Sequence, residues 1–347
     1  MDRFERKGIS FAGNMLVDVV KNVDCYPEQG MLANISSLSR AVGGCVPNTA
    51  IDLSVIDDSI SLSVFGRIGQ DSYGDFILSS LERRGIDCTG VVRSEDTATS
   101  FTDVMNLPSG ERTFFHFPGA NAMFSPEDVD LSSIRGRILH VGYLMLLKRF
   151  DEKDPQCGTV MARFLRDVQA SGIQTSIDAV SSSSSDYAAI IRPSLHYCDY
   201  VIMNEIECCR AWDIDPYPSA RLDIDMIWKA MCLTMNAGVG RKVIVHCREA
   251  GFCLDRSGEF TVVPSLEIPE SVIKGSVGAG DAFAAGCLYG IYHHLPDREI
   301  LKFASQAAAC SLFSETSVGG MQDRNEIMRL EELYQRKKLD PTQTVGF

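Results

Sequence analysis

The chain has 347 residues, and its 46 acidic side chains outnumber its 33 basic ones, which gives a formal net charge of −13 with histidine counted as neutral. A protein that binds nucleic acid usually presents a basic face, and here no basic run is longer than residues 336–338, so we expect no nucleic-acid partner. Hydrophobic residues make up 45% and charged residues 23%, which excludes a disordered or fibrous chain.

The twelve cysteines indicate a reducing compartment. They are scattered from Cys25 to Cys310, and none forms a Cys-x-x-Cys pair, which argues against a disulfide framework and against a zinc ribbon. Residues 1–7 are mostly charged and lack the apolar core of a signal peptide. The apolar stretch 279–295 is interrupted by Asp281 and is shorter than a bilayer span. We therefore expect a cytoplasmic protein with free thiols and no membrane partner.

Short β-rich runs alternate with helical patterns along most of the chain. The predicted strands of this pattern are residues 9–12, 61–65, 137–141, 174–177, 200–203 and 242–245. The helices expected between them include residues 75–84, 158–170 and 225–237. This alternation predicts an α/β fold with a doubly wound, mainly parallel sheet flanked by helices on both faces.

Two stretches depart from that alternation and predict a small antiparallel β lid. Residues 17–40, and then 97–105 with 111–117, have strand patterns without an intervening helix. The second pair forms a hairpin that turns at residues 107–110, which contain Pro and Gly. Because these strands are inserted between βα units, we expect a lid subdomain rather than a separate domain.

The expected organisation is therefore a single domain over residues 1–347, with the lid at about 14–45 and 97–121. Residues 322–347 predict a charged C-terminal helix and tail, in which Leu330, Leu333 and Tyr334 have helical spacing. The serine run 181–185 predicts a flexible loop, whose role the sequence does not show.

The segment 276–286 carries the clearest chemical motif. Its small residues let the backbone approach a ligand, and the helix that follows directs its free N–H groups and its positive dipole end at one point. We therefore expect an anion hole. Asp281 lies at the mouth of the same helix, where it can take a proton from a hydroxyl that attacks a phosphoryl group. The alternative is that Asp281 only caps the helix.

Two other phosphate-binding motifs are excluded. The chain contains no Gly-x-x-x-x-Gly-Lys-Ser/Thr sequence, so it is not a P-loop enzyme. The glycines at 278 and 280 lack the third glycine of the dinucleotide-binding fingerprint.

Six segments, taken in chain order, resemble the landmarks of the ribokinase-like, or PfkB-type, carbohydrate kinase family. They are residues 13–18, 42–50, 66–74, 118–122, 204–207 and 277–283. The resemblance covers roughly residues 8 to 320, and the ordered set is more specific than any one segment. It implies a ribokinase-like fold and an ATP-dependent phosphotransferase, assisted by Mg²⁺, that phosphorylates a hydroxyl of a small sugar or sugar acid. It also implies a homodimer formed through the lid.

The resemblance implies a role for particular residues. Asp281 would be the catalytic base, and the backbone of Gly278, Ala279 and Gly280 would hold the transferring phosphoryl group. The substrate-binding residues would be Asp18, Gly43, Gly44 and Asn48. Carboxylates and amides can bind vicinal hydroxyls, and glycine lets the backbone come within hydrogen-bond reach. A helix cap at Asn48 and a plain turn at the two glycines are the alternatives.

Asn204 and Glu207 are three residues apart after a predicted strand and share one face of a starting helix. The resemblance implies that they order water around the Mg²⁺ of the nucleotide, so that no direct protein ligand to the metal is predicted. Glu205 is expected to be an exposed helix start. Arg248 would add positive charge near the phosphates or point to solvent. Asp178, at a strand end, is a weaker candidate for the same cleft.

The chain also departs from the family pattern. Gly275 stands where many members carry the Asp of a monovalent-cation site, so we do not expect activation by K⁺. Cys45 follows the paired glycines where ribokinases have Lys, so the sugar need not be ribose. His116, on the lid hairpin, is expected to be an ordinary surface or core residue. A nucleoside kinase of the same fold and a non-catalytic sugar-binding regulatory protein remain alternatives, and the sequence does not identify the sugar.

Overall fold

The computed structural model describes residues 6–109, 111–181, 184–218 and 220–339. Its strands are β1 (Ile9–Gly13), β2 (Leu16–Val23), β3 (Ile35–Gly43), β4 (Leu62–Gly69), β5 (Asp87–Ser94), β6 (Phe101–Asn106), β7 (Arg112–Phe117), β8 (Ile138–Leu144), β9 (Lys153–Asp154), β10 (Gly158–Thr159), β11 (Gln174–Ala179), β12 (Tyr200–Asn204), β13 (Lys242–His246), β14 (Ala250–Asp255) and β15 (Phe260–Pro264). Its helices are α1 (Cys45–Ile56), α2 (Ser72–Glu82), α3 (Val160–Ala170), α4 (Tyr187–Leu195), α5 (Glu205–Arg210), α6 (Ile224–Asn236), α7 (Ala279–Tyr292), α8 (Asp297–Ser311) and α9 (Arg324–Leu333), with short 3₁₀ turns at Gly119–Ala122, Pro126–Asp128 and Glu270–Val272.

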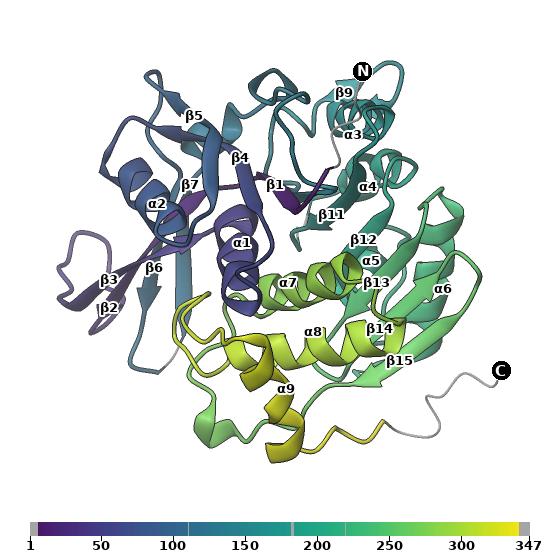
Figure 1. The fold of residues 1–347 in the computed structure, drawn as a ribbon. Helices are drawn as coiled ribbons and strands as arrows, with labels where there is room; N and C mark the ends of the chain where they lie inside the picture. Colours follow the sequence, from purple (N-terminus) through teal and green to yellow (C-terminus); the bar gives the residue numbers. More distant parts are fainter. Residues whose placement is uncertain (1–5, 110, 182–183, 219, 340–347) are drawn as a thin grey trace.

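The main sheet has nine strands in the order β15-β14-β13-β12-β11-β8-β1-β4-β5 (Figure 1). The pairs from β13 to β5 are parallel, and β14 and β15 are added antiparallel at one edge. All five residues of the interior strand β1 are buried, as expected for a strand covered on both faces. The predicted doubly wound, mainly parallel sheet is confirmed.

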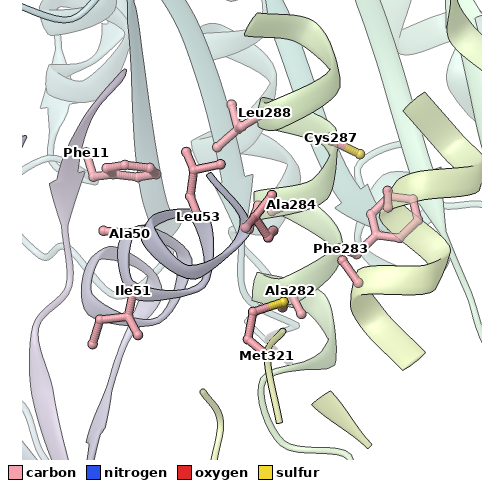
Figure 2. Packing of buried hydrophobic residues seen from close by; sticks show 14 of the residues in the cluster. Phe11, Ala50, Ile51, Leu53, Ala282, Phe283, Ala284, Cys287, Leu288 and Met321 are labelled. Atoms are coloured by element: carbon pink, nitrogen blue, oxygen red, sulfur yellow. The ribbon is translucent and has the colours of Figure 1, made fainter. Parts of the chain in front are cut away.

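Two hydrophobic cores cover the two faces of this sheet. One contains buried side chains of α1, α2, α7 and α8, and the other contains those of α3, α4, α5 and α6. Figure 2 shows α1 packed directly against α7, with Ala50 and Leu53 of the first helix close to Ala284 and Leu288 of the second. Because these side chains are small or fully buried, the two helices are held in a fixed relation at the sheet.

The small sheet has the strand order β3-β2-β6-β7 and extends to one side of the main sheet (Figure 1). The pairs β2–β3 and β6–β7 are antiparallel as expected, and a parallel pair between β2 and β6 joins them in the middle. Every residue of β7 and most of β3 are exposed. Of the predicted hairpin turn, Gly110 lies outside the described residues, as do Ser182 and Ser183 of the serine run.

The C-terminal helix is shorter than the charged segment that predicted it. In α9, Ile327 and Leu330 are buried, whereas Leu333 is exposed. The chain then returns to the main body, where Lys337 N donates to Ser265 O at 2.8 Å and Lys337 Nζ donates to Arg248 O at 2.7 Å. The end of the tail, residues 340–347, lies outside the described residues.

The sequence predicted free thiols and no membrane-spanning segment, and the structure describes both features. All twelve cysteines carry free thiols. Within the residues that the structure describes, no helix combines the length and the apolar character needed to cross a bilayer.

Candidate active site

Helices α1 and α7 both begin at the edge of the main sheet where its parallel strands end, which is where α/β folds usually bind ligands. Each helix is preceded by a glycine with a positive φ, 90° at Gly44 and 86° at Gly278. A Cβ at Gly44 would lie 2.6 Å from Asn14 O, and one at Gly278 would lie 2.3 Å from Ser317 O. Both helix starts therefore require glycine, for the backbone angle and for the space.

The carboxylate of Asp281 is in the first turn of α7, with only 4% of the residue exposed. Its Oδ2 accepts a hydrogen bond from Asn48 Nδ2 at 2.8 Å, and its Oδ1 accepts one from Tyr143 OH at 2.5 Å. Burial raises its pKa to about 6, while these hydrogen bonds oppose the rise. Asp281 is thus held by side chains of other elements, and Gly278, not Asp281, is the N-cap of α7.

Asn48 links two distant parts of the chain. While its Nδ2 donates to Asp281, its Oδ1 accepts from Ser317 Oγ at 2.9 Å. The residue lies inside α1 and is buried, so the helix-cap alternative does not hold. Its hydrogen bonds fix the orientation of the Asp281 carboxylate.

Tyr143 is a site residue that the sequence analysis missed. It lies near the carboxyl end of β8, and its backbone N–H donates to Asn14 Oδ1 while its hydroxyl donates to Asp281. The signal was present, because a polar side chain just after a predicted central strand falls at the ligand-binding edge of a parallel sheet. This signal could be used only once the order of the strands in the sheet was known.

Asp18 approaches Asp281 from the small sheet. It is half-buried on β2, and its pKa is raised to about 6, first by burial and then by the negative charge of Asp281. A Cβ at Gly43 would lie 2.5 Å from Asp18 Oδ2. Glycine at position 43 therefore makes room for the Asp18 carboxylate, which is more than the plain turn considered above.

The register of the small sheet extends this row of side chains. Asp18 is paired with Thr102, and Thr102 is paired with His116, so the three share one face of the sheet. Thr102 Oγ1 lies 3.1 Å from His116 Nδ1. His116 is exposed, but it belongs to the same row as Asp18.

A pocket of about 820 Å³ opens beside the start of α7. Its lining includes Asn204, Glu205, His246, Arg248, Leu266, Ile268, Ile273, Ala279, Gly280, Phe283, Leu312 and Lys337. A Cβ at Gly280 would come no closer than 3.6 Å to His246, so the protein itself would tolerate a side chain there. The missing side chain leaves free space against the N-terminal turn of α7, where an anion is favoured.

Asn204 and Glu207 form the capping box of α5. Glu207 is buried, and its carboxylate accepts from Asn204 Nδ2 at 2.7 Å and from Ser181 Oγ at 2.9 Å. Burial is the largest cause that raises the pKa of Glu207 to about 7. Of the pair, Asn204 lines the pocket. Glu205 also lines it, and because it is half-buried and accepts from Tyr217 OH at 2.7 Å, the expectation of an exposed helix start was wrong.

Carboxylates gather around Asp281. Burial, followed by the charges of Glu207 and Asp281, raises the pKa of Asp178 well above its ordinary value. The pocket beside Gly280 has a mixed lining, with the cations Arg248 and Lys337 and the carboxylates Glu205, Glu267 and Glu270. A neutral, hydroxyl-bearing group is therefore favoured beside Asp18 and Asp281, whereas in the pocket an anion is favoured where it meets the N-terminal turn of α7 and the two cations.

Comparisons with known proteins agree with this geometry. Residues 7–323 match the family model described as "pfkB family carbohydrate kinase". The chain is 25% identical to fructokinase-1 of Zea mays, over 93% of this chain and 97% of that protein. It is 22% identical to 5-dehydro-2-deoxygluconokinase of Geobacillus kaustophilus, over 95% and 96% of the two chains.

Solved structures share the fold. Ribokinase from Thermotoga maritima superposes with a TM-score of 0.77 at 20% identity, over 94% of this chain and 99% of that one. Arabidopsis thaliana ribokinase complexed with ribose and ATP also gives 0.77, at 19% identity over 94% and 98% of the chains. Since the family model covers nearly the whole described chain, the protein belongs to the pfkB family of carbohydrate kinases.

Proposed function

We propose that this sugar kinase transfers the γ-phosphoryl group of ATP to a hydroxyl of a small sugar or sugar acid, with Asp281 as the general base. The observation that carries the proposal is the state of Asp281. It is buried and hydrogen-bonded by Asn48 and Tyr143, and its pKa of about 6 leaves it ionised at neutral pH. A base must be deprotonated to accept the hydroxyl proton, and a pKa near the working pH suits that task.

The backbone of Gly278, Ala279 and Gly280 would form the anion hole for the transferring group. The N–H groups at the start of α7 have no partner in the preceding turn of a helix and carry the positive end of its dipole. Preorganised donors of this kind stabilise the charge that develops on a phosphoryl group. The open space over Gly280 supports this assignment.

The pocket beside α7 would hold ATP. Its volume and apolar wall suit a nucleotide, and the positive charges of Arg248 and Lys337 would attract the phosphate groups. Mg²⁺ would neutralise phosphate oxygens when the nucleotide is bound. Asn204 lines this pocket, and Glu207 orients the Asn204 amide, so the pair fits a role in ordering metal-bound water without direct ligation.

Asp18, the Gly43–Gly44 backbone and Asn48 would bind the sugar hydroxyls. Because the Asn48 amide holds the Asp281 carboxylate, Asn48 would act mainly through the base. We propose that the small sheet closes over the sugar as a lid within one domain, and that two copies pair through it. The exposed Leu38, Phe114 and Phe115 support such pairing, because burial in a dimer would remove their apolar surface from water. Sedimentation of the purified protein tests the dimer.

The free thiols of the twelve cysteines support a cytoplasmic location. K⁺ is not expected to activate the enzyme. A Cβ at Gly275 would lie 3.0 Å from Ser314 O, so this position offers only backbone oxygens where a carboxylate would favour a cation.

A coupled assay of ADP release tests the function. The substrates are fructose, ribose, 5-dehydro-2-deoxygluconate, a sugar phosphate and adenosine, each with Mg²⁺-ATP. We expect saturable ADP release with one of the sugars or the sugar acid. A preference for adenosine would support the nucleoside kinase instead, and sugar binding without turnover would support the regulatory protein. Exchange of K⁺ for a bulky organic cation at constant ionic strength should leave the rate nearly unchanged.

A further inference from the structure

Three side chains that commonly bind metals meet in the interior near the start of α1. Cys45, His140 and Asp178 each offer one ligand atom, and these atoms lie within 4.8 Å of one another. Cys45 and His140 are fully buried, and Asp178 is 7% exposed. The three residues come from α1, β8 and β11, so only the fold brings them together.

The neighbouring strands β8 and β11 explain the convergence. His140 is paired with Ser176, and Asp178 follows two residues later, at the register irregularity between Ile177 and Ala179. Gly142 keeps the space between them open. A Cβ at position 142 would lie 2.5 Å from Cys45 Sγ and 3.4 Å from Asp178 Cβ. Any larger residue at 142 would separate the thiol from the carboxylate.

The hydrogen bonds of the cluster are incomplete. His140 Nδ1 lies 2.9 Å from Ser176 Oγ, but His140 Nε2 is buried and has no hydrogen-bond partner within the described part of the chain. Cys45 Sγ makes only a long contact of 3.9 Å to Thr49 Oγ1. A buried polar atom without a partner costs about 1–3 kcal/mol, and a bound ion that accepts the lone pair of His140 Nε2 would remove this cost.

We propose that Cys45, His140 and Asp178 bind one Zn²⁺-type divalent cation. A sulfur, an imidazole nitrogen and a carboxylate oxygen form the ligand set that zinc prefers, and three protein ligands leave a fourth position for water or a substrate oxygen. His140 would ligate through Nε2, while Nδ1 donates to Ser176 Oγ and fixes the ring orientation. Mg²⁺ prefers an all-oxygen shell, so this site is separate from the cation that accompanies the nucleotide.

The position of the metal site, next to Gly43, Gly44 and Asp281, indicates what the ion would do in the kinase. Cys45 directly follows Gly43 and Gly44, and the charge of Asp281 acts on both Cys45 and Asp178. A bound cation would fix the start of α1 and would stabilise the ionised form of Asp281. This consequence rests on the proposed function, whereas binding of the ion does not.

The first test titrates the intact protein, stripped with a chelator and kept reduced by a phosphine, with Co²⁺ and then Zn²⁺ in excess Mg²⁺. We expect one tight equivalent of Co²⁺ with the visible spectrum of a tetrahedral ion and a thiolate-to-cobalt charge-transfer band, both removed by one equivalent of Zn²⁺. Cys45→Ser should lose the charge-transfer band. Cys310→Ser, at an equally buried cysteine outside the cluster, should keep it.

Two further measurements keep all three ligands in place, so they do not risk disrupting the packing of the core. Ser176→Ala keeps all three ligands and should weaken zinc binding by about 10- to 100-fold, because it removes only the partner that orients His140. X-ray absorption of the wild-type zinc complex should show one sulfur at about 2.3 Å together with nitrogen and oxygen neighbours at about 2.0–2.2 Å.

The proposal is overturned if the wild type binds no Zn²⁺, if Cys45→Ser keeps the charge-transfer band, if Ser176→Ala leaves the affinity unchanged, or if two or more sulfurs surround the ion. The last result would assign the metal to other cysteines. None of these outcomes bears on kinase activity, and a lack of kinase activity with the substrates above would leave the zinc result standing.

Discussion

The candidate site has two walls, and they are built differently. The wall that carries Asp281 belongs to α7, whose residues from Asp281 to Leu288 are all buried, and it packs against α1 in the core (Figure 2). The wall that carries Asp18 belongs to the small sheet, whose outer strands β3 and β7 are mostly exposed. Regions with few buried apolar contacts open at lower free energy than the core does. Changes in the first wall should therefore affect turnover and stability, and changes in the second should affect substrate affinity.

The largest effect is expected at the base. Asp281→Asn removes the proton acceptor but keeps the size of the side chain, so kcat should fall by roughly two to four orders of magnitude while nucleotide binding persists. Steady-state rates and a nucleotide titration measure the two quantities. Asp52→Asn, a buried carboxyl on α1 outside the hydrogen bonds of the site, is the matched control and should keep its kcat. If Asp281→Asn keeps more than about a tenth of the wild-type kcat, Asp281 is not the base.

Asp18→Ala tests the exposed wall. A hydrogen bond to a charged group contributes about 1.5–3 kcal/mol, so the KM for the preferred sugar should rise by about 10- to 150-fold with a smaller change in kcat. The KM for ATP serves as the internal control and should stay the same. An unchanged sugar KM would remove Asp18 from the substrate site and would weaken the contrast between the walls.

Tyr143→Phe should move the pH dependence of the reaction. The Tyr143 hydroxyl stabilises the ionised form of Asp281, whose pKa is about 6, so its loss should raise that pKa. The base works only when it is deprotonated, so kcat should begin to fall at a higher pH, by about one unit. Profiles of kcat against pH measure the shift. Tyr200→Phe, whose hydroxyl donates to Gln174 at 3.4 Å, should leave the profile in place, and an equal shift in both variants would speak against a specific role for Tyr143.

The last effect concerns stability and not the reaction. Both carboxylate oxygens of Asp52 lack a hydrogen-bond partner within the described residues, and burial raises its pKa well above the ordinary value. The folded state therefore binds this proton more tightly than the unfolded state, so the stabilising contribution is present at low pH and is lost as pH rises towards the folded-state pKa. Asp52→Asn does not titrate, so its stability relative to the wild type should improve by up to about 1.4 kcal/mol for each pH unit above 4. Urea unfolding at pH 5 and pH 8 measures the difference, and a constant difference would show that Asp52 is ionised in the native state.

The sequence predicted the features that depend on neighbouring residues. The glycines at 278 and 280, Asp281 and the pair Asn204 and Glu207 lie within short segments whose local geometry determines their position. The alternation of strands and helices was sufficient to predict the mainly parallel sheet, because each βα unit folds back onto the sheet with the same hand. These predictions needed no knowledge of distant contacts.

The features that were missed depend on strand order. Tyr143 and Asp281 are 138 residues apart, and the parallel pairing of β2 with β6 joins strands separated by two helices and three other strands. Neither contact can be predicted from the periodicity of the hydrophobic residues or from the residue types in the turns. The cluster of Cys45, His140 and Asp178 has the same cause, since no spacing in the sequence resembles a metal motif.

The prearranged carboxylate of Asp281 has a consequence for fidelity. Its hydrogen bonds to Asn48 and Tyr143 are made within the protein, so, if Asp281 is the base, a water molecule in place of the sugar would meet a carboxylate already oriented to activate it. Under that proposal, assembly of the base on arrival of the sugar would not limit hydrolysis of ATP. Hydrolysis would have to be limited by keeping water out of line with the phosphoryl group, a task that would fall to the small sheet.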